Sequence, residues 1–353
     1  MSRSGKVAAD PEASAAPAGA RAPWYRGLVR EELGVTVALV VLVAAVGAAE
    51  PRFLTSLNLL SIGEGSVYVG LMACGMVFAL AMREVDLSVG GNYALCVVAG
   101  AVLIRGGLDP WLVLPIVLLL GALVGVANGL VTSLGLPSFI VTLASALLCR
   151  GIALALADGK QITDLPADHP FFAVVAGDAL GVPVAIWVLV LVAAGLTLVL
   201  TRTRFGVRVR AIGSNPDAAA FSGLPVTRTR VAAMGVAGLS AGVAGVLSLA
   251  FYIAGDPTIG QGYELTAIAA CIIGGTTLAG GRGSVPGAAI GNLLLSTVAA
   301  SLVFFRVPIN RTTFATGAVI LVAVGVDALL RRIRGHGVLP RRRGPPPQDE
   351  EVP

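Results

Sequence analysis

The chain contains 353 residues, of which 56% are hydrophobic and only 13% are charged, and its mean hydropathy is +0.87. Soluble domains carry about 25% charged residues, so this composition excludes a soluble enzyme, a disordered protein and a disulfide scaffold. Several apolar runs reach the ~20 residues that a helix needs to cross a bilayer. We therefore expect an all-α fold in the form of a polytopic membrane helix bundle.

The cysteines and histidines give no indication of a metal site. There are four cysteines and two histidines, and no two cysteines stand at the spacing of a CxxC motif. We expect the cysteines to be small buried hydrophobic residues, and we predict no metal and no cofactor in this chain. The four are Cys74, Cys96, Cys149 and Cys271.

Ten apolar segments are candidates for membrane passes. A polar, Ala/Pro-rich tail (1–33) precedes them and is predicted to be disordered, and a basic, Pro-rich tail (331–353) follows them. The region between, 34–330, is predicted to be one membrane domain. The third and eighth segments are short and interrupted by glycine, so we expect them to be broken or re-entrant. In chain order the segments are about 34–49, 59–82, 87–104, 111–132, 138–156, 184–201, 231–252, 264–280, 286–305 and 312–330.

Lys and Arg residues are distributed unevenly between the connecting segments. If the N-terminus is cytoplasmic, the inside segments hold 19 of them and the outside loops hold 5. Cytoplasmic loops of membrane proteins carry such an excess, so both termini are predicted to lie in the cytoplasm. This topology accounts for the net charge of +5, which therefore does not indicate nucleic-acid binding.

Glycine recurs at every fourth position in three of the apolar segments. This spacing places the glycines on one face of a helix, where a neighbouring helix can approach closely. We interpret these residues as packing sites. They are Gly121, Gly125 and Gly129, then Gly238 and Gly242, and finally Gly287 and Gly291.

The polar loop 202–230 contains a short predicted helix. Asn215 is a favourable N-cap and Pro216 suits the first helical position, while Asp217 favours the positive end of the helix dipole. Gly223 ends the helix. A helix of about two turns is not stable alone in water, so it docks onto a partner, unless it is only a capped surface turn between two spans.

A charged, glycine-containing stretch, 83–92, separates the second and third segments. Ionisable groups at membrane depth are costly unless they are paired or hydrated, so they usually line a cavity or a helix interface. Asp86, Ser88 and Asn92 are therefore candidates for supporting a translocation pathway. Asp86 and Ser88 have an alternative, purely structural role as caps of the third segment.

Glycines are dense between positions 274 and 284, after a segment that begins at Glu264. They permit a tight turn or a re-entrant backbone at a membrane face. Glu264 either pairs structurally or contacts a substrate or partner. The chain contains no GxxxxGK[ST] and no GxGxxG motif, which argues against nucleotide binding. The glycines assigned to turns and packing here are Gly274, Gly275, Gly280, Gly281 and Gly283.

Five motifs, taken in order, resemble the permease subunit of ATP-binding-cassette (ABC) importers for simple sugars, the ribose/xylose/galactose branch. Two residues depart from the family pattern, because Arg83 stands where the family often has glycine and Glu64 adds an acidic residue early in the second segment. The motifs extend over roughly residues 55–330. They are Glu84-Val85-Asp86-Leu87-Ser88-Val89-Gly90, Ala127-Asn128-Gly129, Pro137 to Leu143 with Arg150-Gly151, Ala211 to Gly223, and Gly262 to Gly287.

The resemblance implies that this chain is one subunit of a transporter with several subunits in the inner (plasma) membrane. Two permease copies, identical or related, would form a pathway for a monosaccharide or polyol that an extracytoplasmic binding protein delivers. A separate ATPase, which holds ATP and magnesium, would drive the cycle, so this chain is not itself an enzyme. The pathway residues implied are Asp86, Ser88, Asn92, Asn128, Phe139, Thr142 and Glu264, and the coupling residues are Gly213, Asn215, Pro216, Asp217, Ala218, Ala219 and Gly223.

Other transporters share parts of this pattern. Branched-chain amino-acid and nucleoside permeases have the same broad architecture, and a self-sufficient secondary transporter is a further alternative. An intramembrane transferase is disfavoured because the chain has no aspartate-rich DDxxD motif.

Overall fold

The computed structural model describes residues 25–306 and the isolated positions 308, 314, 317, 318, 321 and 325. In this part of the chain seven helices are long and apolar enough to cross a membrane, as expected for a polytopic membrane helix bundle. They are α1 (Tyr25–Ala49), α2 (Ser56–Ala81), α4 (Pro110–Thr132), α5 (Ser138–Leu156), α7 (Val184–Arg202), α10 (Val226–Tyr252) and α12 (Val285–Phe304).

Two shorter apolar helices occupy the predicted third and eighth segments. α3 (Val89–Arg105) has 17 residues and α11 (Tyr263–Ile273) has 11, so α11 is too short to cross a bilayer as a single helix. The tenth predicted segment, 312–330, lies outside the described residues except at positions 314, 317, 318, 321 and 325, and the tail 331–353 lies wholly outside them.

The structure corrects the predicted end of the disordered tail, whereas the part of α1 that suits a membrane, Glu32–Ala49, begins close to the predicted position 34. α1 begins at Tyr25, so residues 25–33 are helical and do not belong to a disordered tail. The apolar run alone marks only the part of a helix that suits a bilayer, and a helix continues beyond that part where its backbone hydrogen bonds remain favourable. Residues 1–24 lie outside the described part of the chain.

The loop 202–230 is also more helical than predicted. Its first half forms α8 (Arg204–Ser214), which directly precedes α9 (Pro216–Phe221). Val209 and Ile212 of α8 are buried in the core, whereas Arg204 and Arg208 are exposed. An apolar face of this kind stabilises a short helix by packing. The prediction of a loop did not take this packing into account.

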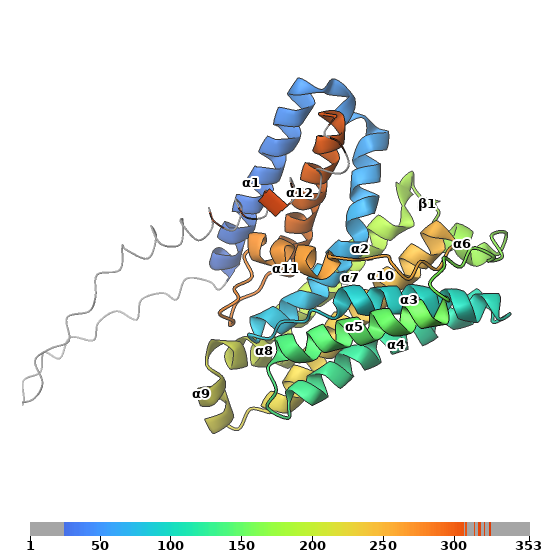
Figure 1. The fold of residues 1–353 in the computed structure, drawn as a ribbon. Helices are drawn as coiled ribbons and strands as arrows, with labels where there is room; N and C mark the ends of the chain where they lie inside the picture. The colour runs from blue at the N-terminus through green and yellow to red at the C-terminus, as the bar shows by residue number, and fades with distance from the viewer. Residues whose placement is uncertain are drawn as a thin grey trace, which may run out of the picture.

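The two ends of the bundle differ in structure (Figure 1). α8 and α9 lie at one end, and the opposite end carries α6 (Pro170–Val175) and an antiparallel hairpin formed by β1 (Asp178–Ala179) and β2 (Val182–Pro183). A short 3-10 helix, η1 (Pro51–Leu54), joins α1 to α2. α3, α4 and α5 run side by side, and α12 lies along α1.

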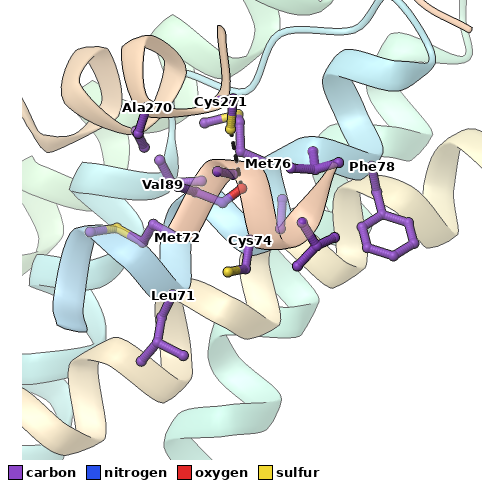
Figure 2. Packing of buried hydrophobic residues seen from close by; sticks show 14 of the residues in the cluster. Leu71, Met72, Cys74, Met76, Phe78, Val89, Ala270 and Cys271 are labelled. Atoms are coloured by element: carbon purple, nitrogen blue, oxygen red, sulfur yellow. Dashed lines mark hydrogen bonds between the residues drawn. The ribbon is translucent and has the colours of Figure 1, made fainter. Parts of the chain in front are cut away.

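α2 is the central helix of the fold. It contacts α7, α10, α11 and α12, and its buried residues continue almost without a break from Ser66 to Ala81. A helix enclosed in this way is apolar all round. All four cysteines are buried and free, which confirms the expectation from the sequence. Figure 2 shows Leu71, Met72, Cys74, Met76 and Phe78 of α2 beside Val89 of α3 and Ala270 and Cys271 of α11.

Glycines bring α4 and α10 into backbone contact. A Cβ atom added at Gly121 would lie 2.7 Å from the carbonyl oxygen of Gly238, and one added at Gly125 would overlap the carbonyl oxygen of Met234. A Cβ atom at Gly129 would lie 2.6 Å from the Cα atom of Val231. The glycine stripe of α4 therefore faces α10, and it permits an approach that no larger residue allows. The same device joins α11 to α12 through Gly274, Gly287 and Gly291.

Gly125→Ala is expected to destabilise the protein, because the new methyl group would force α4 away from α10. Overpacking of this kind costs about 1–3 kcal/mol. The matched control is Gly195→Ala in α7, where a Cβ atom would meet no atom within 4 Å. Thermal unfolding of the purified variants in detergent measures the effect. Equal melting temperatures for the two variants would contradict the assignment of Gly125 to close packing.

Candidate functional site

Side chains of α5 hold the segment that connects α2 to α3. Ser138 accepts a hydrogen bond from the backbone N–H of Val85 at 3.1 Å, and Thr142 accepts one from the N–H of Leu87 at 3.0 Å. The Thr142 hydroxyl also lies 3.1 Å from the carbonyl oxygen of Val85. Backbone groups that no helix satisfies are costly within a membrane protein. Thr142 and Ser138 therefore fix the course of this segment against α5.

A buried polar cluster follows directly. The Asp86 carboxylate oxygen Oδ1 accepts hydrogen bonds from the Ser88 N–H at 2.8 Å and from the Ser88 hydroxyl at 2.6 Å. Asn128 of α4 donates from Nδ2 to the Ser88 hydroxyl at 2.8 Å. All three side chains are buried, and Asp86 Oδ2 has no hydrogen-bond partner among the described residues. Burial raises the pKa of Asp86, although the hydrogen bonds from Ser88 oppose the shift.

Asn92 extends this polar contact one turn further along α3. Its side-chain Nδ2 donates to the carbonyl oxygens of Gly121 at 3.1 Å and Gly238 at 3.4 Å. Asn92 therefore bonds to α4 and α10 where the glycines bring these helices together. Ser88 stands at the N-cap position of α3, but its side chain makes no capping hydrogen bond. Its hydroxyl bonds to Asp86 and Asn128 instead, which corrects the alternative that Ser88 caps the third segment.

Two of the expected pathway residues lie away from this cluster. Phe139 is 53% exposed on the outer face of α5. Glu264, in the first turn of α11, lines a cavity of about 300 Å³ between α3, α5 and α11. The polar residues of the cavity wall are Arg150, Gln261 and Glu264, and the rest of the wall is formed by Leu87, Gly91, Leu143, Ala146, Leu147, Gly262 and Leu265.

The polar groups of the cavity are positioned by backbone contacts. Arg150 donates from Nη1 to the carbonyl oxygen of Pro257 at 3.1 Å and to that of Ile259. The carboxylate of Glu264 packs against Gly90, where a Cβ atom would collide with it. Arg150 is therefore already engaged as a donor to the segment before α11. Glu264, Gln261 and the rest of the Arg150 guanidinium group are the polar groups that a solute in the cavity would meet.

A group of tyrosines was not anticipated from the sequence. Tyr68 and Tyr93 have ring centroids 6.5 Å apart, Tyr68 and Tyr252 6.4 Å, and Tyr93 and Tyr263 5.8 Å. Tyr93 donates a hydrogen bond to Ser248 at 2.7 Å, whereas the buried hydroxyl of Tyr68 has no partner among the described residues. Four separate helices supply these rings, one tyrosine from each. Spacing along the chain therefore could not reveal the group.

The predicted coupling helix forms with the expected caps. The Asn215 side chain accepts a hydrogen bond from the Ala218 N–H at 3.0 Å, and Pro216 opens α9. Gly223 has a φ of 74°, and the N–H of Leu224 donates to the carbonyl oxygen of Ala219 at 3.0 Å. This is the Schellman arrangement that ends a helix.

α9 presents one face to the protein and another to its surroundings. Ala219 is buried against the bundle, whereas Asp217 and Ala218 are exposed. Phe221, at the end of α9, is 93% exposed. The sequence analysis did not single out Phe221, although a large aromatic residue in an exposed, capped helix indicates a contact surface. Gly213, by contrast, is buried against the end of α2 and the turn at Gly281.

The arrangement defines a class of protein before any comparison is made. A bundle of apolar helices borders a cavity whose wall carries polar groups, and a capped helix stands out from one end of the bundle (Figure 1). This combination belongs to a membrane permease.

Comparison with known proteins gives the family. Residues 57–324 match the family described as branched-chain amino acid transport system / permease component, and the chain belongs to this family. It is 38% identical over 300 residues to the ribose import permease protein of Bacillus subtilis, covering 85% of this chain and 93% of that protein. It is 34% identical over 313 residues to the D-allose transport system permease protein of Escherichia coli, covering 88% and 95%.

A third relative extends the similarity over more of the chain. The L-arabinose ABC transporter permease protein of Azospirillum brasilense is 32% identical over 330 residues, covering 93% of this chain and 96% of that protein. No solved structure matches. The relatives therefore span most of the chain, and their names refer to two pentoses and a hexose.

Proposed function

We propose that this chain is the membrane-spanning subunit of an ATP-driven importer, and that it forms the pathway for a monosaccharide or related polyol. The observation that carries the proposal is the similarity to permeases named for ribose, allose and arabinose over 85–93% of the chain. A separate ATPase binds and hydrolyses ATP with magnesium, and an extracytoplasmic binding protein delivers the solute. A second permease, identical or related, completes the pathway.

The cavity between α3, α5 and α11 suits a sugar. Glu264 and Gln261 offer oxygen acceptors and an amide donor for hydroxyl groups, and the leucines of the wall pack against the apolar side of a pyranose ring. Arg150 donates to Pro257 and Ile259 through Nη1 alone, so its positive charge remains part of the cavity wall.

The orientation follows from the distribution of charge. Both termini, α8 and α9 lie in the cytoplasm, and α6 with the β1–β2 hairpin lies outside, in a plasma or inner membrane. Arginines flank α9 on both sides in the sequence, as is typical of cytoplasmic segments. α9 is then placed to contact the ATPase, and the exposed face of α5, which carries Phe139, is placed to contact the second permease.

Reconstitution tests the proposed function directly. Proteoliposomes that contain the permease, its ATPase and its binding protein are expected to accumulate labelled ribose, allose or arabinose when ATP is supplied. The permease alone, with a proton or sodium gradient, is expected to accumulate none. Uptake by the permease alone would identify a secondary transporter. Competition by leucine in place of sugars would identify an amino-acid permease.

Phe221→Asp is expected to weaken binding of the ATPase without unfolding the permease. Substitution of an exposed residue changes stability little, whereas loss of an aromatic anchor from an interface costs about 2 kcal/mol or more, or roughly 30-fold in affinity. Leu180→Asp is the matched control, because Leu180 is 94% exposed in the hairpin at the other end of the bundle. Co-purification of the ATPase measures the effect, and equal retention by both variants would contradict the role of α9.

Glu264→Gln is expected to weaken recognition of the sugar in the cavity. Hydrogen bonds to a charged group contribute about 1.5–3 kcal/mol, so the sugar concentration at half-maximal uptake should rise about tenfold or more. Glu50→Gln changes a carboxylate outside the cavity wall and should leave uptake unchanged. An unaltered half-maximal concentration for Glu264→Gln would remove Glu264 from the pathway.

A further inference from the structure

Arg83 adopts a backbone conformation that disfavours any side chain. It lies two residues beyond the end of α2 and has a φ of 65°, in the left-handed region that glycine occupies most readily. Such a conformation persists in a non-glycine residue when the surrounding structure compensates for its cost. The contacts of the Arg83 side chain are therefore informative.

The guanidinium group of Arg83 binds the end of α8. Its Nε donates to the carbonyl oxygen of Gly213 at 2.6 Å, and its Nη2 donates to that of Ser214 at 2.8 Å. These carbonyls belong to the last turn of α8, where a positive charge and additional donors are favourable. The next residue is Asn215, the N-cap of α9. Arg83 thus holds the junction at which α9 begins.

Glu84 makes the complementary contact on the far side of α9. Its carboxylate oxygen Oε1 accepts a hydrogen bond from Nε of Arg230 at 2.6 Å, in an ion pair whose Glu84 side chain is only 14% exposed. Arg230 lies in the second turn of α10, the helix that follows α9. Two consecutive residues, Arg83 and Glu84, therefore bind the helices on both sides of α9.

The same segment leads directly into the buried polar cluster. The N–H of Val85 is held by Ser138, and Asp86 bonds to Ser88, which accepts a hydrogen bond from Asn128 of α4. Two residues beyond Asp86, at Ser88, the chain enters α3, which with α5 and α11 forms the cavity. A displacement of α9 would thus reach the cavity through a short run of hydrogen-bonded residues.

We propose that Arg83 and Glu84 are positioning residues that transmit movement of α9 to the helices around the cavity, and so make sugar passage depend on ATP hydrolysis. The proposal rests on the proposed function, because it takes α9 as the contact with the ATPase. It adds a specific route by which the movement is transmitted. This route runs from the C-terminal end of α8 and the N-terminal part of α10 through residues 83–88 to α3, α4 and α5.

Arg83→Gly is the first test, because it removes the side-chain contacts while glycine accepts the positive φ of this position. In proteoliposomes with the ATPase and binding protein, the ATPase should remain bound. The number of ATP molecules hydrolysed per sugar imported should rise about fivefold or more, at the lower end of coupling between sites. Arg105→Gly, at the exposed C-terminal end of α3, should leave the ratio unchanged. A wild-type ratio in Arg83→Gly would overturn the proposal.

Exchange of charges tests the Glu84–Arg230 pair. Glu84→Arg and Arg230→Glu should each raise the ratio of ATP to sugar, and the double variant should restore it towards the wild-type value. A role limited to local stability would not require the two substitutions to compensate in coupling. A double variant that retains the ATPase but couples no better than the single variants would contradict the link.

A readout that needs no sugar separates this proposal from the proposed function. A fluorophore on Leu147→Cys, in the cavity wall, should respond when the ATPase is trapped with ATP and vanadate, and Arg83→Gly should abolish the response. If the wild-type complex responds but imports no sugar, the proposed substrate is wrong and the link stands. If Arg83→Gly responds as the wild type does, the link is wrong whatever the substrate.

Discussion

The structure depends on satisfying the backbone of one segment that belongs to no helix. Residues 82–88 lie between the end of α2 and the start of α3, and Met82, Asp86 and Ser88 are buried whereas Arg83 is exposed. Buried N–H and C=O groups without partners cost several kcal/mol each. Ser138 and Thr142 of α5 and the Asp86 carboxylate supply the missing partners. These contacts fix where α3 begins, and α3 forms one side of the cavity.

Close packing by glycine gives that segment a rigid frame. α4 and α10 touch through their backbones at Gly121, Gly125 and Gly238, and the amide of Asn92 bonds to the carbonyl oxygens exposed there. Small residues are useful in this way because lipid offers no hydrophobic advantage for helix association, so van der Waals contact and interhelical hydrogen bonds must supply it. α5 has few buried residues, at Ser138, Thr142, Cys149 and Ala153, and so contributes one wall of the cavity while leaving its other face free.

The sequence predicted features that arise within one segment, and it did not predict contacts that join distant segments. The apolar runs indicated nine of the described helices, and the Asn215–Pro216 pair and Gly223 indicated both ends of α9, because each depends on neighbouring residues alone. α8 lies in a segment that was predicted to be a loop, because arginines make up much of its short sequence and obscure the apolar pattern. Its buried residues Val209 and Ile212 nevertheless stand three positions apart, as expected for one face of a helix. The tyrosine group needs four helices to assemble, so no local pattern could indicate it.

The pathway residues show the same limit. Asp86, Ser88 and Asn128 were grouped by resemblance, and they do lie together, but inside a helix interface and not on the cavity wall that Glu264 lines. A polar residue within an apolar segment indicates that its side chain needs a hydrogen-bond partner. Only the fold decides whether that partner is a solute or another helix. Here Ser88 bonds to Asp86 and to Asn128 of α4, whereas Asp86 Oδ2 has no partner among the described residues.

Arg83 illustrates why a departure from a family pattern can be more informative than agreement with it. Glycine at that position would satisfy the backbone alone, since the φ of 65° suits it. Arginine introduces conformational cost, but it also adds two hydrogen bonds to the end of α8 at Gly213 and Ser214. Because charge-assisted hydrogen bonds are stronger than neutral ones, the arginine makes the junction before α9 more rigid. In the proposed coupling route, a stiffer junction would pass on more of a displacement of α9 to α3.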